Sequence, residues 1–332
     1  MDKRTRLETT LSGEIPDQTP VSFWRHWQGD DQRAADLARA TIDFQQRFDW
    51  DFSVVVPSNT YSVMDYGITD RWDSSLDGRR TITRHIIEKS LQWTELRPND
   101  PMRGTMGKYL EAVRLVANQL SAENIPVLAV IYSPLAQASR ISGENYLIRS
   151  LRTRADRLRT GLNTLTESTL RLLEALRQTN IDGIVYVVEH ANFSCLTPGE
   201  YQEFGVTYDR KIVDMIVNRW WFNILQLHGD SPMFEIMSTY PAQVISWNSQ
   251  DTKPDLSIAR NLFNGTLCTG LSPETHMHRG TPSIIKLAAN EAMSTMNQRR
   301  LILSAGGHVP ITTPISNLQA VCDAVSTKTG LN

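Results

Sequence analysis

The sequence predicts an α/β fold, namely a single (β/α)8 TIM barrel, and two observations support this prediction. Short apolar runs rich in Val, Ile and aromatic residues recur eight times, separated by amphipathic stretches; this is the alternation of a parallel α/β fold. The runs show little polar alternation, which is typical of strands buried on both faces. A doubly wound open sheet is the main alternative, but no Gly-rich phosphate-binding turn follows the first run.

The predicted elements follow one another in regular order along the chain. The predicted strands are residues 20–26, 52–59, 126–134, 183–191, 221–230, 242–249, 266–272 and 301–308. The predicted helices cover residues 31–48, 105–120, 151–179, 198–218, 282–298 and 315–325. Thr197 and Pro198 mark the start of the fourth helix, because Thr is a good N-cap and Pro is favoured in the first turn.

The length and the spacing of these elements predict one domain. The 332 residues fit one barrel, which typically needs about 250 residues or more. We expect a polar N-terminal arm over residues 1–19 and the barrel domain over residues 20–332. The longest interruption, residues 58–105, contains the polar stretch DGRRTITRHIIEKS and is expected to form an excursion over one end of the barrel.

Composition argues against several classes of protein. The 34 Lys and Arg and 36 Asp and Glu give a formal charge of −2, whereas nucleic-acid and membrane-surface proteins normally carry a basic excess. No apolar stretch reaches the roughly 18 residues of a membrane span. The N-terminus lacks the apolar core of a signal peptide, and 3 Cys are too few for a disulfide framework. We therefore expect a cytoplasmic protein with neither nucleic-acid nor membrane partners.

The active site of such a barrel lies at the carboxyl ends of its strands, so the polar residues there are the candidates. They are Arg25, His26, Ser58, Asn59, Ser133, Glu189, His190, His228, Asp230, Asn248, Ser272, Ser304 and His308. Four of the 7 histidines fall among them. Clustered histidines usually serve acid–base or metal chemistry, which makes this rim the predicted catalytic face.

Three candidates allow more than one interpretation. Glu189 and His190 are adjacent, so in a strand they point to opposite faces and need not touch; they form either an acid–base pair or a rim Glu satisfied by backbone groups. Arg25 could clamp a substrate carboxylate or phosphate, or could pair with a nearby aspartate.

A metal site is a further hypothesis. His228, Asp230 and His308 could supply three ligands to a divalent ion such as zinc, with an open fourth position for catalysis. The sequence Asp230-Ser231-Pro232 equally predicts an N-cap for a following short helix.

Taken together, the strand ends resemble those of the uroporphyrinogen decarboxylase superfamily, from about residue 20 to the end. The resembling segments are PVSFWRH, FDWDFSVVVPSNTYSVMDYG, IPVLAVIYSPLAQA, VEHANFSCLTPGEYQEF, LQLHGD, VISWNSQDTKPDLSIARNLFNGTLCTGL and ILSAGGHVPITTPISNLQAVCDAV. The last, with its x-P-x-x-T-P-x-x-N-L motif, is the most specific. The resemblance implies a (β/α)8 barrel that is often dimeric.

The decarboxylase branch of this superfamily implies one set of roles. Its members remove acetate carboxyl groups from a tetrapyrrole without a cofactor, and Arg25 matches the arginine that binds substrate carboxylates. Ser58 or Asn59 stands where the branch has an aspartate, and Ser139 or Arg140 stands where it has a tyrosine. His308 lies within a residue of the family's late histidine.

The second branch contains corrinoid- or thiol-directed methyltransferases, which bind zinc through His-x-Cys and a later Cys. His228 matches the histidine, but Asp230 and Gly307 replace the two cysteines. The resemblance therefore implies that a zinc site of this kind would have to be formed by His228, Asp230 and His308 in place of the thiolate ligands.

The leading hypothesis is a cofactor-free decarboxylase acting on a tetrapyrrole or another organic acid. Arg25 would orient carboxylates, and one of His26, His190, His228 or His308 would protonate the carbanion. Ser58, Asn59, Ser133, Arg140, Glu189 and Asn248 are the expected substrate-binding residues. Two alternatives stay open: a metal-dependent methyltransferase working with a corrinoid protein or a folate, and a non-catalytic ligand-binding barrel. A homodimer is expected in each case.

Overall fold

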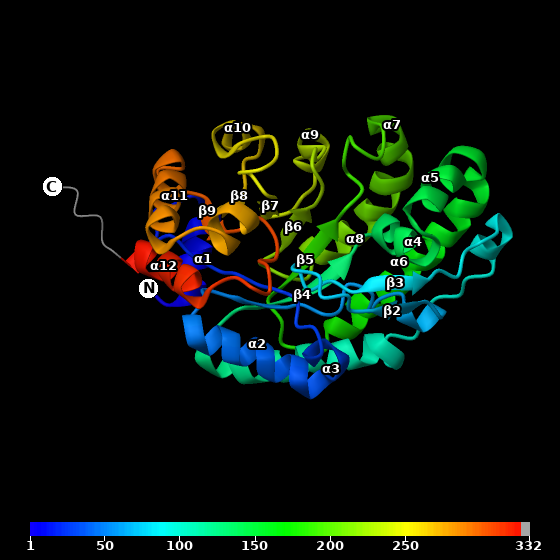
Figure 1. The fold of residues 1–332 in the computed structure, drawn as a ribbon, viewed down its shortest axis with the longest axis horizontal. Helices are drawn as coiled ribbons and strands as arrows, with labels where there is room; N and C mark the ends of the chain where they lie inside the picture. The colour runs from blue at the N-terminus through cyan, green and yellow to red at the C-terminus, as the bar shows by residue number, and fades with distance from the viewer. Residues whose placement is uncertain (327–332) are drawn as a thin grey trace.

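The computed structural model describes residues 1–326 and contains a curved parallel sheet with helices around it (Figure 1); residues 327–332 of the predicted domain lie outside the described residues. The sheet order is β1-β4-β5-β6-β7-β8-β9, and every neighbouring pair is parallel. The strands are β1 (Ser53–Val55), β4 (Val127–Tyr132), β5 (Gly183–Val188), β6 (Ile224–Leu227), β7 (Val244–Ser246), β8 (Thr266–Gly270) and β9 (Leu301–Ser304). Consecutive strands are thus spatial neighbours, which confirms the predicted α/β barrel class.

An extended segment at residues 20–24 closes the ring between the first and last strands of the sheet. Val21 forms a parallel bridge with Leu303 of β9, and the backbone N–H of Asp51 donates to the Val21 carbonyl at 2.9 Å. The predicted strand over 20–26 is nevertheless reduced to this bridge. The Asp51 carboxylate accepts the Val21 N–H at 2.7 Å, so a side chain occupies one place in the backbone ladder.

Helices form the outer layer (Figure 1). The α-helices are α1 (Lys3–Ser12), α2 (Ala34–Phe48), α3 (Gly104–Leu120), α4 (Pro134–Ser142), α5 (Glu144–Thr153), α6 (Ala155–Leu176), α7 (Pro198–Tyr201), α8 (Thr207–Val217), α9 (Phe234–Met237), α10 (Leu256–Leu262), α11 (Pro282–Thr295) and α12 (Ile315–Ser326). Shorter helical turns are η1 (Asp30–Gln32), η2 (Met64–Tyr66), η3 (Ser90–Thr94), η4 (Ser121–Glu123), η5 (Gln202–Val206) and η6 (Pro273–His278). The sequence patterns predicted the long helices but missed α1, α4, α5 and α10, which have ten residues or fewer.

The N-terminal arm is a helix that covers the amino ends of the strands. Leu7 is fully buried, and Thr266 at the start of β8 donates its hydroxyl to the Thr10 carbonyl at 3.3 Å. Arg6 pairs with Asp51 just before β1 at 2.5 Å. The arm expected at residues 1–19 therefore contributes to the core at the end of the barrel opposite the carboxyl ends, and leaves those ends open.

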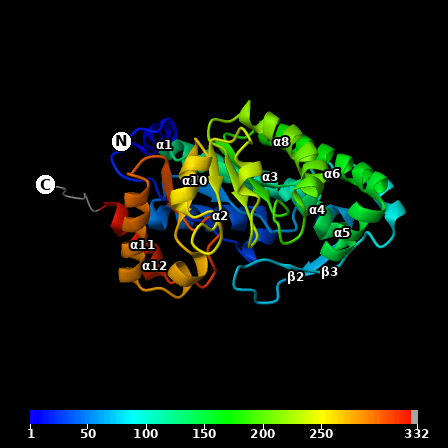
Figure 2. The ribbon, with the colours of Figure 1, turned by 90° about the horizontal axis from the view of Figure 1, so that it is seen from above.

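The excursion over residues 58–105 contains an antiparallel pair, β2 (Thr69–Arg71) and β3 (Thr81–Arg84). Figure 2 shows this pair and its long connecting loop at the edge of the molecule. The loop returns to the barrel, because Ile311 donates its backbone N–H to the Leu76 carbonyl at 2.8 Å. Gly78 fits tightly there: its φ is +75°, and a Cβ would lie 2.8 Å from the Cβ of His26. The excursion thus brings residues 76–79 to the barrel mouth.

A buried polar cluster joins β5 to the helices outside it. Asp209 of α8 accepts hydrogen bonds from the hydroxyls of Tyr186, Tyr201 and Tyr240, and all four side chains are buried. Burial raises the pKa of Asp209 to about 6, although the three tyrosine hydrogen bonds oppose this shift.

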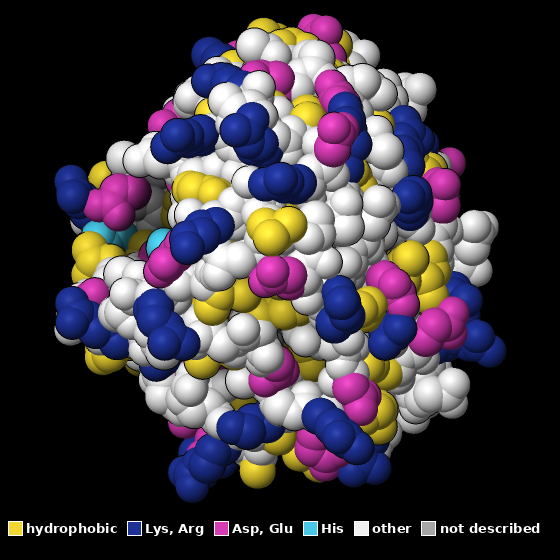
Figure 3. Space-filling model, turned by 90° about the vertical axis from the view of Figure 1, so that its right-hand side faces the viewer, with side chains coloured by type: hydrophobic (Ala, Val, Ile, Leu, Met, Phe, Trp, Pro, Cys, Tyr) yellow, Lys and Arg dark blue, Asp and Glu magenta, His cyan; other side chains and the backbone are white. Residues whose placement is uncertain are grey.

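The molecular surface agrees with the near-zero net charge. On the face drawn in Figure 3, Lys and Arg side chains lie interspersed with Asp and Glu. Among the described residues, no helix is both long and apolar enough to cross a membrane.

Candidate active site

Two adjacent cavities lie at the carboxyl ends of the strands. The first, which we name the inner chamber, has a volume of about 20 Å³ and is lined by Trp24, His26, Val56, Arg79, Val130, Tyr132, Val187, Glu189, Gln226, His228 and His308. The second, the outer cleft, has a volume of about 550 Å³, and its polar lining comprises Asp77, His228, Asp230, Asn248, Asp251, Thr252, Glu274 and His308. His228 and His308 line both cavities and so lie between them.

Three predicted histidines meet in the inner chamber. The rings of His26 and His308 are 4.9 Å apart between centroids, and those of His228 and His308 are 5.8 Å apart. His26 donates its Nδ1–H to the Pro57 carbonyl at 3.1 Å, which leaves Nε2 as an acceptor. The amide of Gln226 donates to Nε2 of His228 at 2.5 Å.

Burial keeps these imidazoles neutral at pH 7. It lowers the pKa of His228 to about 4 and that of His308 to about 3, and the charge on Arg79 acts in the same direction. Burial likewise holds the pKa of His26 well below its ordinary value. The cluster therefore offers hydrogen-bond donors and acceptors without net charge.

An ion triad forms one wall of the chamber. Oε1 of Glu189 accepts from Nη2 of Arg79 at 2.5 Å and from Nη2 of Arg140 at 2.8 Å. Burial alone would raise the pKa of Glu189, but the two guanidinium groups hold it well below its ordinary value. Glu189 in turn raises the pKa of Arg79, so all three groups are charged. The predicted residues Arg140 and Glu189 are thus brought together.

Asp77 places a carboxylate beside the histidines. Its Oδ2 lies 4.0 Å from Nε2 of His308. Hydrogen bonds from the Ser75 hydroxyl and the Arg79 backbone N–H lower the pKa of Asp77 despite its partial burial. An ionised Asp77 would stabilise His308 whenever that imidazole takes up a proton.

The structure places Arg25 and His190 outside this cluster. The Arg25 guanidinium lies over Trp27, 4.3 Å from the ring centroid, and donates to the Ile311 carbonyl at 3.1 Å. His190 points to the outer side of β5, where its Nε2 lies 3.0 Å from Oε2 of Glu144. Glu189 and His190 therefore face opposite sides, as expected for neighbours at the end of a strand.

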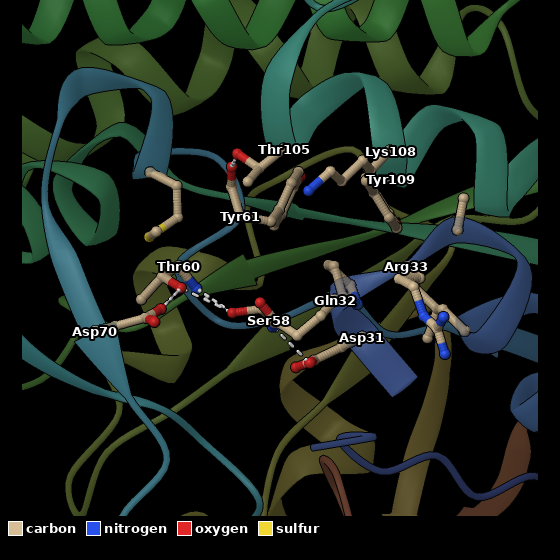
Figure 4. Close-up of a pocket in the computed structure, with 14 residues that line it drawn as sticks. Asp31, Gln32, Arg33, Ser58, Thr60, Tyr61, Asp70, Thr105, Lys108 and Tyr109 are labelled. Atoms are coloured by element: carbon tan, nitrogen blue, oxygen red, sulfur yellow. Dashed lines mark hydrogen bonds between the residues drawn. The ribbon is translucent and has the colours of Figure 1, made fainter. Parts of the chain in front are cut away.

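Ser58 and Asn59 also lie away from the chamber. Figure 4 shows Ser58 in a separate pocket, where its hydroxyl and that of Thr60 are 2.7 Å apart and Thr60 continues to Asp70. Asn59 exchanges two hydrogen bonds with the backbone of Arg80, at 2.7 and 3.1 Å. Both side chains hold the base of the excursion in place, so their predicted substrate contact has no counterpart in the chamber.

Ser133 and Asn248 have structural partners as well. Ser133 is the N-cap of α4, accepting from the Ala136 N–H at 3.3 Å, and it is buried. Asn248 lines the outer cleft, where its Nδ2 donates to Asp251 at 2.8 Å. Of these two residues, only Asn248 is in a position to meet a ligand.

The residues do not fit a resident zinc ion. Asp230 is exposed at the cleft, and among residues 1–326 no group of three or more His, Cys, Asp or Glu side chains is arranged to hold a metal. A Cβ at position 307 would lie 3.8 Å from Cε1 of His228, so a side chain there would approach that ring, but the residue is Gly307. The His228/Asp230/His308 centre is therefore not formed among the described residues.

The sequence patterns missed several residues of the site, among them Arg79, Asp77, Tyr132 and Gln226. Arg79 and Asp77 come from the excursion, and Tyr132 comes from the carboxyl end of β4. The polar stretch DGRRTITRHIIEKS was the available signal, since it was expected over a barrel end, but nothing in it distinguishes Arg79 from its neighbours Arg80 and Arg84.

Comparison with known proteins agrees with this architecture. The sequence profile described as uroporphyrinogen decarboxylase (URO-D) matches residues 2–327. The chain belongs to the uroporphyrinogen decarboxylase family.

Within the family, the curated relatives that match are methyltransferases. A methylcobamide:CoM methyltransferase of Methanosarcina mazei is 21% identical over 329 residues, covering 97% of this chain and 93% of the relative. The Methanosarcina acetivorans protein of the same name is 20% identical over 306 residues, covering 91% of this chain and 86% of the relative.

Two solved structures share the fold. A methyltransferase from Methanosarcina mazei superposes with a TM-score of 0.85 at 18% identity and covers 98% of both chains. A B12-independent methionine synthase from Shewanella superposes with a TM-score of 0.54 at 11% identity and covers 94% of both chains.

Proposed function

We propose that this protein is a methyltransferase that moves a methyl group from a corrinoid to a small acceptor held between the outer cleft and the inner chamber. The family relatives that match nearly the whole chain carry this activity in their names. The observation in this chain that supports it is the pair His228 and His308, two neutral imidazoles that line both cavities. His308 is able to receive the proton that an acceptor loses on methylation, whereas Nε2 of His228 already accepts from the amide of Gln226.

In each turnover a lone pair of the acceptor atom forms a bond to the methyl carbon, the electron pair of the bond from that carbon to the donor stays with the donor, and the acceptor releases one proton. His308 is the better proton acceptor of the two, because Asp77 lies 4.0 Å from its Nε2 and would stabilise the imidazolium. An imidazole with a pKa of about 3 leaves a thiol protonated in the ground state. It takes the proton as the new bond makes the sulfur strongly acidic, so the interaction favours the transition state.

The reaction is proposed to proceed without a resident metal. The zinc-binding methyltransferase branch needs two thiolates that Asp230 and Gly307 do not provide, and the described side chains form no other centre of three such ligands. Acceptor activation would then rest on hydrogen bonding and proton removal alone.

Decarboxylation, the leading hypothesis from the sequence, has weaker support. It depended on Arg25 as the clamp for substrate carboxylates, and that guanidinium lies over Trp27 outside both cavities. The matching curated relatives also belong to the methyltransferase branch. A corrinoid-bearing protein is therefore the proposed partner, and the homodimer stays a prediction.

The test uses purified protein, methylcobalamin as the donor and a panel of small thiols as acceptors, with the methylated product measured by mass spectrometry. We expect product from the wild type and a loss of about 100-fold or more in His308→Gln, as is common when a general acid–base group is removed. His278→Asn is the matched control, because His278 contacts Thr312 at 3.0 Å and lines neither cavity. Equal rates in His308→Gln and the control would refute the proposed role of His308.

A further inference from the structure

Three arginines lie near the barrel mouth, and only Arg79 faces the inner chamber with unused hydrogen-bond donors. Arg140 is 6% exposed, donates to both Ala136 and Glu189, and lies over Tyr132 at 4.2 Å. Arg25 is stacked on Trp27. Arg79 keeps 31% of its side-chain surface open and lines the chamber.

The Arg79 guanidinium uses one of its five N–H donors within the protein. Nη2 donates to Glu189 at 2.5 Å, and no other described residue accepts a hydrogen bond from this side chain. The remaining donors lie in a fixed planar fork, which matches the oxygens of a carboxylate or a sulfonate.

The position of Arg79 is fixed before any ligand arrives. Its backbone N–H donates to Oδ1 of Asp77 at 2.9 Å, and Glu189 holds its guanidinium from the barrel side. The preceding Gly78 has φ +75° and fits against His26 so closely that a Cβ would lie 2.8 Å from the His26 Cβ. A ligand would therefore meet a guanidinium that needs no reorganisation.

The charges around Arg79 and the size of the inner chamber both favour binding of a small anion beside Arg79. Glu189 is shared between two guanidinium groups, and the facing imidazoles are neutral. Asp77 is the other nearby carboxylate, and it bonds to Ser75 and to the Arg79 backbone while facing the outer cleft. The chamber volume of about 20 Å³ admits one small polar group, whereas the outer cleft of about 550 Å³ holds a larger body.

We propose that Arg79 binds the anionic end group of the acceptor, a carboxylate or a sulfonate, and so determines the specificity of the site. The anionic end enters the inner chamber beside Arg79, and the remainder of the acceptor passes His228 and His308 into the outer cleft. Arg79, supplied by the excursion, thereby takes the role that the family resemblance implied for Arg25. This inference rests on the proposed function only in naming the ligand as the methyl acceptor.

Calorimetric titration without any methyl donor tests this proposal. The probes are 3-mercaptopropionate, 2-mercaptoethanesulfonate and the uncharged 2-mercaptoethanol. We expect the wild type to bind at least one of the two anions about 10- to 100-fold more tightly than 2-mercaptoethanol, in line with one charge-assisted interaction. Arg79→Gln should abolish this preference.

Arg84→Gln is the matched control, because Arg84 ends β3, the strand that follows Arg79, but is exposed and bonds to the Gly67 carbonyl; this variant should bind the probes as the wild type does. Arg79→Lys retains the charge without the planar fork and should keep a weaker preference, which also covers the case in which Arg79→Gln fails to fold. Equal binding of all three probes by the wild type, or an unchanged preference in both Arg79 variants, would overturn the proposal.

Binding and turnover separate the two proposals. If the anion binds through Arg79 but no methylated product forms with any donor, the anion site stands and methyl transfer fails. If product forms at equal rates in Arg79→Gln and the wild type, methyl transfer stands and the role of Arg79 fails.

Discussion

Replacing Glu189 with Gln tests whether the ion triad holds the chamber wall together. Gln retains the shape of the side chain and one acceptor oxygen, but it removes the negative charge shared by Arg79 and Arg140. Arg140 is 6% exposed, so it would be left with a buried charge and a second guanidinium nearby.

The expected loss in the free energy of unfolding is about 3 kcal/mol. Breaking a buried ion pair by removing one partner costs about 3–5 kcal/mol. The lower end applies because Glu189 is 16% and Arg79 31% open to the chamber, where water screens part of the charge.

The pH dependence has a definite sign. The folded-state pKa of Glu189 is depressed, so its stabilising contribution is present above its unfolded value and is lost as the pH falls through the folded value. The difference between wild type and Glu189→Gln should therefore be full at pH 7 and shrink in acid.

Urea denaturation followed by circular dichroism at pH 7 provides the assay. The control is Glu111→Gln, since Glu111 also accepts two hydrogen bonds from a guanidinium, that of Arg114, at 2.8 and 2.9 Å, but on the exposed surface. This exposed pair should contribute less than about 1 kcal/mol. Unfolding of Glu189→Gln at the same urea concentration as Glu111→Gln would rule out a stabilising role for the ion triad. Replacing both Glu189 and Arg140, the latter with Met, should recover much of the loss.

Three further outcomes are expected. Because the folded-state pKa of Asp209 is raised to about 6, its contribution to stability is full only below its unfolded value of about 4 and is lost as the pH rises through 6. The stability of the wild type relative to Asp209→Asn should therefore fall by about 2 kcal/mol between pH 4 and pH 6; an equal pH dependence of the two proteins in urea titrations would contradict this. Leu7→Ala should lower the free energy of unfolding by about 2–5 kcal/mol, because Leu7 is fully buried beneath the barrel. A decrease in melting temperature no larger than that of a surface substitution would show that α1 is dispensable for stability. Asp230→Cys combined with Gly307→Cys should create a zinc site with His228, because a side chain at position 307 would approach that ring. Metal analysis of the double variant should give about one zinc per chain. A zinc content equal to that of the wild type would show that the three side chains do not meet.

Strand–helix alternation predicted the barrel well because burial on both faces imposes a clear apolar pattern on parallel strands. The first strand was predicted too long, since sequence does not reveal that the Asp51 carboxylate takes the Val21 N–H. The sequence also did not reveal that the N-terminal arm has a buried face. That face is small, because one turn of α1, around Leu7 and Thr10, supplies it.

The site was predicted in part. Positions at the predicted strand ends indicated correctly that four residues lie together, because the carboxyl ends of parallel strands converge. These residues are His26, His228, His308 and Glu189. Strand-end position failed for Arg25, whose long side chain reaches back to Trp27, and for Ser133, which caps a helix that the sequence patterns did not predict. It could not find Arg79 or Asp77, since their approach to the mouth depends on how the excursion folds back, as fixed by Gly78 and Ile311.

Transfer of a labelled methyl group tests directly whether this protein is a metal-independent methyltransferase. Wild-type protein, dialysed against a zinc chelator, is incubated with trideuteromethyl-cobalamin and 2-mercaptoethanesulfonate or 3-mercaptopropionate, and the thioether is measured by mass spectrometry. A product carrying the trideuteromethyl group, formed at the same rate before and after chelation and reduced in His308→Gln, is the predicted result. The absence of labelled thioether with either acceptor, or its appearance only after zinc is restored, would contradict metal-independent methyl transfer at this site.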